Sequence, residues 1–256
     1  MRRFFPVERL AEHPYSVILG YPKATKAQLK SRMRELNRLG VDGVSFEGPM
    51  QIGRQSVLGK GYTGIVVLAK IGSQKAALKI RRTDSPRQSM EKETVLLEAA
   101  NMTGVGPKII KSSKNFVVME YLDGKKILDW IFELKGKGSA SKLKKTIKKV
   151  LEDCYRLDMA GLDHGELSNI TKHVIVGNSI TIIDFESSSL DRKVSNVTSA
   201  TQAIFIGSGL AKMVRRIYKV PQKQQIIAAL RQYKETRSQA SFDKVLEVLR
   251  LCQMKQ

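Results

Sequence analysis

Apolar positions in the first fifty residues follow three short patterns. Residues 15–22, YSVILGYP, form a short apolar run that predicts a strand. Residues 25–40 repeat leucine or methionine every three or four positions, which predicts a helix that Gly40 ends. Residues 41–48 predict a second short strand. Residues 1–50 are therefore expected to form a small strand–helix–strand extension.

The pattern changes near residue 51. Apolar and β-branched runs predict strands from there to residue 120, with one helix near residues 87–101 between them. Beyond residue 120 the chain is mostly helical, and the clearest helices are residues 141–157 and three segments near the C-terminus. The helix over 141–157 has lysines on its outer face and these apolar residues at helical spacing: Leu143, Ile147, Val150, Leu151 and Cys154. The chain is expected to be α+β, with a β-rich part before a helical part.

Composition adds a charge argument. The 256 residues include 45 Lys and Arg against 24 Asp and Glu, a formal net charge of +21. An excess of this size indicates a polyanionic partner such as RNA, or an anionic membrane surface. A solvated basic surface without a partner is the alternative interpretation. The first forty residues are especially basic, with nine Lys or Arg against three acids.

The cysteines and the apolar runs bear on metal binding, secretion and membrane insertion. Cys154 and Cys252 stand in different segments without metal-ligand spacing, so both are expected to be reduced core residues. The N-terminus lacks the apolar stretch of a signal peptide, and no run has the length of a membrane span. We therefore expect a cytoplasmic protein that does not cross a membrane.

The segment VLGKGYTGIVVLAKIGSQKAALKI contains the most informative motif. Gly59, Gly61 and Gly64 form GxGxxG, and Val66 follows two residues later. Strands are predicted on both sides of this loop, so it forms a hairpin rather than a strand-to-helix turn. Glycines allow a backbone to approach phosphate oxygens closely. Lys79 ends the third strand, where it can reach phosphates, although a glycine-rich hairpin with a surface lysine is the simpler alternative.

These residues resemble the N-lobe of the protein-kinase superfamily. The resemblance implies that a helix glutamate pairs with Lys79, and Glu93 fits the apolar spacing better than its rivals Glu91 and Glu98. Residues 115–124, NFVVMEYLDG, resemble the fifth strand and hinge, with Met119 as gatekeeper. The residues implied to contact ATP are Leu58, Gly59, Gly61, Gly64, Val66, Lys79, the carbonyl of Glu120 and the N–H of Leu122.

The stretch DHGELSNITKHVIV, residues 163–176, departs from the family pattern. His164–Gly165–Glu166 resembles the H-G-D catalytic loop of atypical members, including RIO kinases and the kinase of the KEOPS assembly. Glu166 then orients the acceptor hydroxyl, and Asp163 is the rival acid. The metal-binding asparagine is expected five residues after the acid, but Asn169 follows after three. The residue directly before the next strand is His173, so the metal ligand is Asn169 or His173.

Asp184 follows an apolar strand and precedes Phe185, as in the D-F-G motif, with Glu186 in place of glycine. The resemblance implies that Asp184 binds Mg²⁺. Only 72 residues follow Asp184, and no A-P-E motif is present. This size is similar to that of compact atypical kinases, in particular predicted archaeal Ser/Thr kinases related to the RIO and KEOPS groups.

The resemblance implies a bilobal α+β kinase-like fold. Its parts are a basic extension at 1–50, an N-lobe at 51–120 and a compact C-lobe at 121–256. The implied activity is ATP–Mg²⁺-dependent phosphorylation of protein Ser or Thr, including autophosphorylation. A nucleotide-gated assembly factor on RNA or a ribonucleoprotein, with ATPase activity, is the alternative. Small-molecule phosphotransfer is less favoured, because the residues available are too few for the extended substrate subdomain of antibiotic kinases.

Overall fold

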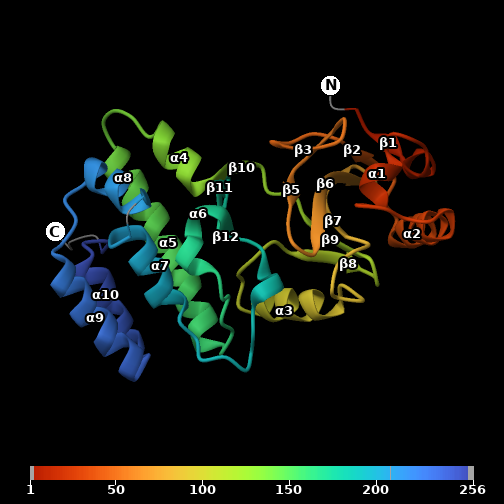
Figure 1. Ribbon diagram of the computed structural model, residues 1–256. Helices are drawn as coiled ribbons and strands as arrows, with labels where there is room; N and C mark the ends of the chain where they lie inside the picture. Colours follow the sequence, from red (N-terminus) through yellow and green to blue (C-terminus); the bar gives the residue numbers. More distant parts are fainter. Residues whose placement is uncertain (1–2, 208, 253–256) are drawn as a thin grey trace. The chain divides into compact units, whose positions relative to one another are not determined.

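The structure is a computed structural model that describes residues 3–207 and 209–252 (Figure 1). The chain divides into two compact units. Unit 1 contains Met1–Glu98 and Pro107–Leu122, and unit 2 contains Ala99–Gly106 and Asp123–Gln256. Unit 1 is built on a large antiparallel sheet and unit 2 is mainly helical, which confirms the predicted α+β class.

The sheet of unit 1 has the strand order β1-β2-β6-β7-β9-β8, with β5 also paired to β6. The strands are β1 (Phe5–Pro6), β2 (Gly43–Ser45), β5 (Gly59–Lys60), β6 (Gly64–Ile71), β7 (Gln74–Arg81), β8 (Ile109–Ser112) and β9 (Phe116–Glu120). A separate hairpin joins β3 (Met50–Ile52) to β4 (Gln55–Val57). The predicted helix between the strands is α3 (Glu91–Met102).

The N-terminal segment differs in one element from the prediction. The strand expected within residues 15–22 is wrong, because Ser16–Leu19 form the short helix α1. Ile18 and Leu19 are both buried although they are neighbours. A strand would point them to opposite faces, whereas adjacent positions on a helical turn can both pack inward. The predicted helix is confirmed as α2 (Lys26–Leu39), which ends at Gly40 in the left-handed conformation.

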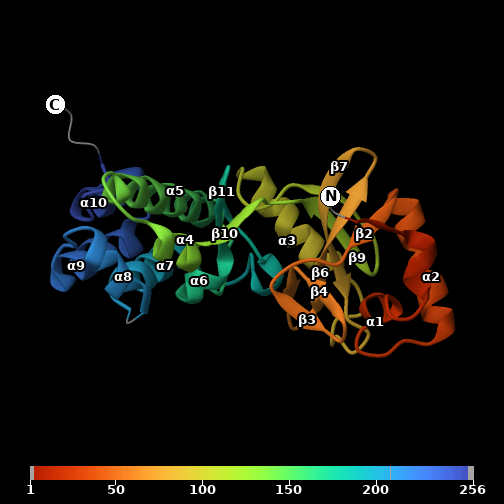
Figure 2. The ribbon, with the colours of Figure 1, turned by 90° about the horizontal axis from the view of Figure 1, so that it is seen from above.

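The central strands of unit 1 bury both faces. Ile65, Val67 and Ala69 alternate along β6 and join one hydrophobic core with Leu36 and Leu39 of α2. The same core receives residues of the 3₁₀ helix η1 (Val7–Ala11) and of α1. In Figure 2 the sheet lies between α2 on one side and α3 on the other. The helices of residues 1–50 therefore cover one sheet face and leave the opposite face to α3, while β1 and β2 extend the sheet itself.

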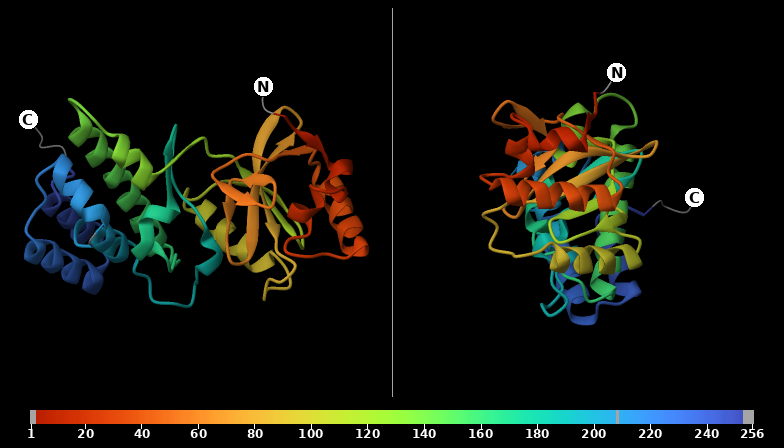
Figure 3. Two further views of the ribbon diagram at one scale, coloured as in Figure 1. Left: turned by 45° about the horizontal axis from the view of Figure 1, so that its top comes forward. Right: turned by 90° about the vertical axis from the view of Figure 1, so that its right-hand side faces the viewer.

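Unit 2 is organised around the long helix α5 (Ser139–Met159). The remaining helices are α4 (Ile127–Glu133), α6 (Ile170–His173), α7 (Asn196–Phe205), α8 (Gly209–Ile217), α9 (Lys223–Thr236) and α10 (Gln239–Val248), with the 3₁₀ turns η2 (Leu167–Asn169) and η3 (Phe185–Ser187). The strands β10 (Gly124–Lys126), β11 (Val174–Gly177) and β12 (Ile180–Ile182) form a small antiparallel sheet. Helices α9 and α10 lie side by side (Figure 3).

A buried carboxylate joins three helices of unit 2. Asp158 of α5 accepts hydrogen bonds from the backbone N–H and the side-chain amide of Asn196, at 2.9 and 2.8 Å. It also accepts from the backbone of Val197 and from the hydroxyl of Tyr233 on α9. Because these donors satisfy the carboxylate, its burial fixes α7 and α9 against α5.

The apolar face predicted for α5 is confirmed, since its five predicted residues are all fully buried. Cys154 is one of them, and burial raises the pKa of its thiol well above the usual value. The prediction for Cys252 is wrong, because this cysteine is exposed. It lies beyond the end of α10 at Val248, so the apolar pattern of that helix does not extend to it. Among the described residues, no helix is both long and apolar enough to cross a membrane.

Candidate functional site

The glycine-rich segment forms the predicted hairpin between β5 and β6. The N–H of Gly61 donates to the carbonyl of Gly64 at 2.8 Å, which closes a tight turn. A Cβ on Gly64 would lie 3.0 Å from Cε of Lys79 and 3.1 Å from the carbonyl oxygen of Ile80. Glycine at this position therefore leaves room for the aliphatic part of the lysine side chain.

Lys79 stands in a row of residues that crosses the sheet. Gly59 pairs with Val66, Val66 with Lys79, and Lys79 with Val117. Since paired residues point to the same face, Val66 and Val117 flank the lysine. Ala77 is two residues before Lys79 on β7, and Met119 is two residues after Val117 on β9. Ala77 pairs with Met119, so both point to the same face as Lys79. The row forms an apolar surface with one cation in it, which is the composition that a nucleotide base and its phosphates require together.

Lys79 and Glu93 form a buried ion pair. Nζ of Lys79 lies 2.5 Å from Oε1 of Glu93, and both side chains are only 6% exposed. The rival acids Glu91 and Glu98 are exposed on α3. The apolar neighbours of Glu93 on the helix therefore indicated the correct partner. A buried ion pair of this kind is costly to form, and its retention makes it a candidate functional group.

The remaining residues implied to contact the nucleotide also lie in unit 1. Leu58 is half-buried between β4 and β5, and its N–H donates to the carbonyl of Val66 at 2.9 Å. Glu120 ends β9, where its N–H donates to the carbonyl of Lys108. Leu122 is half-buried and is the last residue of this unit before the chain enters unit 2.

In unit 2, Asp163 anchors a neighbouring loop. Its Oδ1 accepts from the N–H of Ser195 at 2.9 Å, and its Oδ2 accepts from Nε of Arg192 at 2.5 Å. Its backbone pairs with Ser189 through two hydrogen bonds of 2.9 Å. Asp163 is 3% exposed. All of these contacts are structural, as expected for the acid that the sequence placed second to Glu166.

His164 is fully buried and connects the loop to the strand end before Asp184. Its Nε2 lies 3.0 Å from the carbonyl oxygen of Ile183. Burial lowers the pKa of His164 to about 4. The ring is therefore neutral at pH 7, and since a carbonyl oxygen can only accept, Nε2 carries the proton. The ring also packs edge-on against Phe185, with centroids 5.0 Å apart.

Glu166, His173 and Asp184 form one cluster. Oε2 of Glu166 lies 3.1 Å from Nε2 of His173, and its Oε1 accepts from Oγ of Ser187 at 2.9 Å. Each of the three clustered residues offers a ligand atom within 4.8 Å of the other two. Gly165 makes this approach possible, because its φ is +87° and a Cβ there would lie 2.8 Å from the carbonyl oxygen of Ser187.

Asn169 and His173 occupy different environments. Asn169 is exposed, and its Oδ1 accepts from Oγ1 of Thr171 at 3.0 Å. The turns η2 and α6 place His173 directly before β11, where it is 5% exposed and lies in the cluster. Of the two alternatives left open by the sequence, the structure brings His173 together with Asp184. Counting back from the strand, rather than forward from Glu166, gives this assignment.

Asp184 has an unusual backbone. Its φ of +71° and ψ of +72° lie in the left-handed region, which residues other than glycine rarely adopt. Such a conformation costs about 1–3 kcal/mol and tends to persist at functional sites. It directs the chain from β12 into η3, where Phe185 and Glu186 are buried.

The cluster fits a divalent cation. The carboxylate of Asp184 is the hard oxygen donor that Mg²⁺ and Mn²⁺ prefer, and the carboxylate of Glu166 lies within reach of the same space. The imidazole of His173 adds a nitrogen donor, which is unusual for Mg²⁺ and better suited to Mn²⁺ or another transition metal. His173 is nearly inaccessible to solvent, and its Nδ1 has no hydrogen-bond partner within the described ranges 3–207 and 209–252.

Comparison with known proteins agrees with this geometry. The model of the RIO domain matches residues 69–197, about half of the chain. The uncharacterized protein MJ1211 of Methanocaldococcus jannaschii is 26% identical over 97 residues, which cover 38% of this chain and 80% of that protein. The matched domain contains Lys79, Glu93 and the cluster of unit 2, while the glycine hairpin precedes it. The chain therefore belongs to the RIO domain family, a family of atypical protein-kinase-like proteins.

Proposed function

We propose that this protein is an ATP- and divalent-metal-dependent phosphotransferase that phosphorylates Ser or Thr in proteins, including itself. The buried Lys79–Glu93 pair is the observation that supports this proposal most directly. A lysine held in place by a buried glutamate, beside an apolar row and behind a glycine hairpin, suits the phosphates of a nucleotide. A surface lysine would be mobile and would lack this orientation.

The proposed roles in unit 1 follow from its contacts. Lys79 neutralises charge on the nucleotide phosphates, and Glu93 keeps its ammonium group in position. The hairpin of Gly59, Gly61 and Gly64 brings backbone N–H groups toward the phosphates. Val66 contacts the base on one apolar side, while the backbones of Glu120 and Leu122 contact its polar edge.

The proposed roles in unit 2 follow from the cluster. Asp184 and His173 hold the divalent cation, with His173 replacing the oxygen donor of an asparagine. A bound cation neutralises charge that develops on the transferred phosphoryl group. Glu166 orients the acceptor hydroxyl and accepts its proton. Ser187 donates a hydrogen bond to the Glu166 carboxylate, and Nε2 of His173 lies 3.1 Å from its other oxygen, so both neighbours restrict its rotation.

Incubation with ATP labelled on the γ-phosphate tests the proposal. The purified chain is incubated alone and with a cell extract, in Mg²⁺ and separately in Mn²⁺. Label on serine or threonine of the chain or of an extract protein, absent with Asp184→Asn, supports the proposal. Equal labelling or turnover with Asp184→Asn would contradict it.

The net charge of +21 favours a second function, a nucleotide-gated assembly factor on RNA or a ribonucleoprotein. In that case ATP hydrolysis releases free phosphate, and the nucleotide state changes the affinity for RNA. Lys and Arg within residues 1–40 and 135–149 are candidate contacts. Free phosphate without protein label, together with nucleotide-dependent RNA binding, would favour this function over the first.

A further inference from the structure

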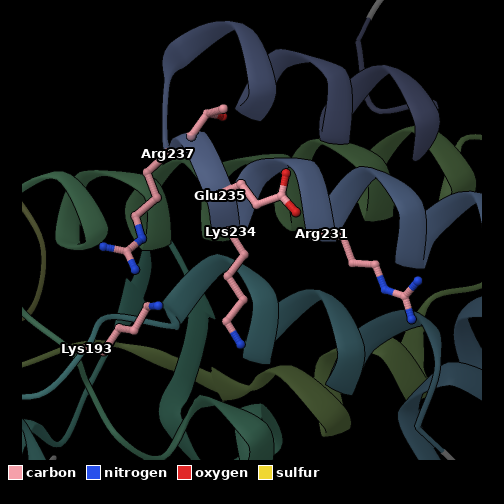
Figure 4. A pocket seen from close by; sticks show the side chains of 6 residues that line it. Lys193, Arg231, Lys234, Glu235 and Arg237 are labelled. Carbon is pink, nitrogen blue, oxygen red and sulfur yellow. The ribbon is translucent and has the colours of Figure 1, made fainter.

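A basic cavity lies at the C-terminal end of α9 in unit 2. Its volume is about 480 Å³. The lining residues are Lys193, Arg231, Lys234, Glu235, Thr236 and Arg237. In Figure 4, Lys193 and Arg237 approach each other from two different segments, Lys234 extends beside them, and Arg231 lies further along the helix. None of these residues belongs to the proposed phosphotransfer machinery.

The charge in this cavity is not balanced. Four of its residues are cations and only Glu235 is an acid. None of the four cations has an ion-pair partner in the described part of the chain. Some other exposed lysines of the same unit do have acids, as in Lys125–Glu133 at 2.6 Å and Lys244–Glu247 at 3.0 Å. The cavity therefore concentrates positive potential.

The arrangement of these cations is electrostatically and conformationally unfavourable. Arg231, Lys234 and Arg237 follow each other at intervals of three, so their side chains share one side of the helix end and repel one another. Arg237 also has a φ of +45°, a conformation in which glycine or asparagine is usual after a helix. The helix dipole favours one or two cations here. It does not account for Lys193, which comes from a different segment.

Lys193 is presented by a fixed loop. The preceding residue, Arg192, donates to Asp163, and Ser195 donates to the same carboxylate. Val194 between them is buried. Because its neighbours are held, the exposed Lys193 side chain adds a cation to the cavity with little loss of backbone entropy on binding.

We propose that this cavity binds backbone phosphates of an RNA. The row from Arg231 to Arg237 spans six residues, about 9 Å along the helix axis, which exceeds the size of one phosphate and suits successive phosphates of a polymer. The net charge of +21 extends the attraction beyond the cavity. This site is independent of the phosphotransfer that we propose for the Lys79 and Asp184 groups.

The test measures RNA binding by the full chain without nucleotide. A fluorescein-labelled RNA stem-loop with a single-stranded tail is titrated by anisotropy over a range of salt concentrations. The variant Lys193→Ala/Arg231→Ala/Lys234→Ala removes three charges and keeps Arg237. The matched control, Lys223→Ala combined with Lys212→Ala and Lys219→Ala, removes three other lysines of unit 2 that do not line the cavity. Thermal unfolding confirms that both variants are folded.

We expect the cavity variant to weaken RNA binding about tenfold or more, and to reduce the slope of log K against log salt by about 2. The control should change both quantities much less. Equal losses in the two variants would overturn the proposal, because they would indicate a diffuse basic surface. Binding of a phosphoserine peptide to the cavity under salt conditions where the RNA does not bind would also overturn it. Loss of RNA binding with unchanged ATP turnover supports the site whatever the outcome for phosphotransfer.

Discussion

Nε2 of His173 lies 3.1 Å from Oε2 of Glu166, seven residues earlier in the chain. The short helical turns between them, η2 and α6, fold the segment back so that both side chains reach Asp184. The histidine thus stands directly before a strand, where the kinase resemblance implies a metal-binding asparagine. This contact determines which of the predicted residues lie together.

His173 should determine metal affinity and metal preference. Calorimetry with Mn²⁺ on the full chain, without nucleotide, should show binding weakened about tenfold or more by Asp184→Asn and by His173→Ala. His173→Asn replaces nitrogen with an oxygen donor, so it should lower the preference for Mn²⁺ over Mg²⁺. Asn169→Ala is the matched control and should bind as the wild type does. Loss of binding in Asn169→Ala with retention in His173→Ala would assign the ligand to Asn169.

Substitution of Glu166 should reduce turnover, whereas substitution of Asp163 should reduce stability. Glu166→Gln keeps the size of the side chain but cannot accept a proton, so kcat should fall about 10²–10⁴-fold with ATP affinity nearly unchanged. Asp163→Asn loses a charged acceptor for Arg192 and Ser195 and should lower the free energy of unfolding by about 2 kcal/mol. Turnover and urea unfolding measure the two effects. An active Glu166→Gln beside a folded, inactive Asp163→Asn would reverse the assignment.

Lys79→Met should abolish nucleotide binding and also lower stability. Glu93 is 5% exposed, so losing its ion-pair partner should cost about 3 kcal/mol. The double variant Lys79→Met/Glu93→Leu removes the buried charge as well and should recover much of that loss without recovering nucleotide binding. Lys75→Met, on the exposed end of the same strand, is the control. Binding of a fluorescent ATP analogue and thermal unfolding are measured together. Full ATP turnover in Lys79→Met would exclude the proposed role.

His164 should make stability depend on pH below neutrality. Burial holds its pKa at about 4, below the ordinary value of 6.5, so the unfolded chain binds the proton more readily. The contribution is fully present above pH 6.5 and is lost as the pH falls toward 4, by about 3 kcal/mol in total. His164→Asn should flatten the unfolding free energy over this range relative to the wild type. His13→Asn, at an exposed position, should not.

Local patterns determined much of the fold. The helices α2 and α5 were predicted because their apolar residues recur at helical spacing, and the hairpin because a short β-branched run, not a helix, follows the glycine loop. Glu93 was selected among three acids because apolar residues around it predict the buried side of α3. Each of these inferences depends on neighbours within about one or two helical turns, where sequence periodicity is informative.

Other features depend on contacts between distant segments. The run YSVILGYP is apolar enough for a strand, but packing against α2 and η1 makes Ser16–Leu19 a helical turn. The composition of residues 1–50 did not reveal that this segment adds two strands to the main sheet and covers one of its faces, because a basic segment can also be a free extension. The unbalanced cations at the end of α9 combine a loop residue with helix residues almost forty positions later.

The sequence by itself determined the α+β class, the kinase-like order of motifs and the positions of Lys79, Glu93, Glu166 and Asp184. Which of Asn169 and His173 lies beside Asp184 is decided only by the tertiary structure. Both are polar residues in one short loop, and their spacing from Glu166 fits the family pattern in neither case. The fold buries His173 beside Asp184 and leaves Asn169 in solvent, because the position of β11 fixes the residue that precedes it.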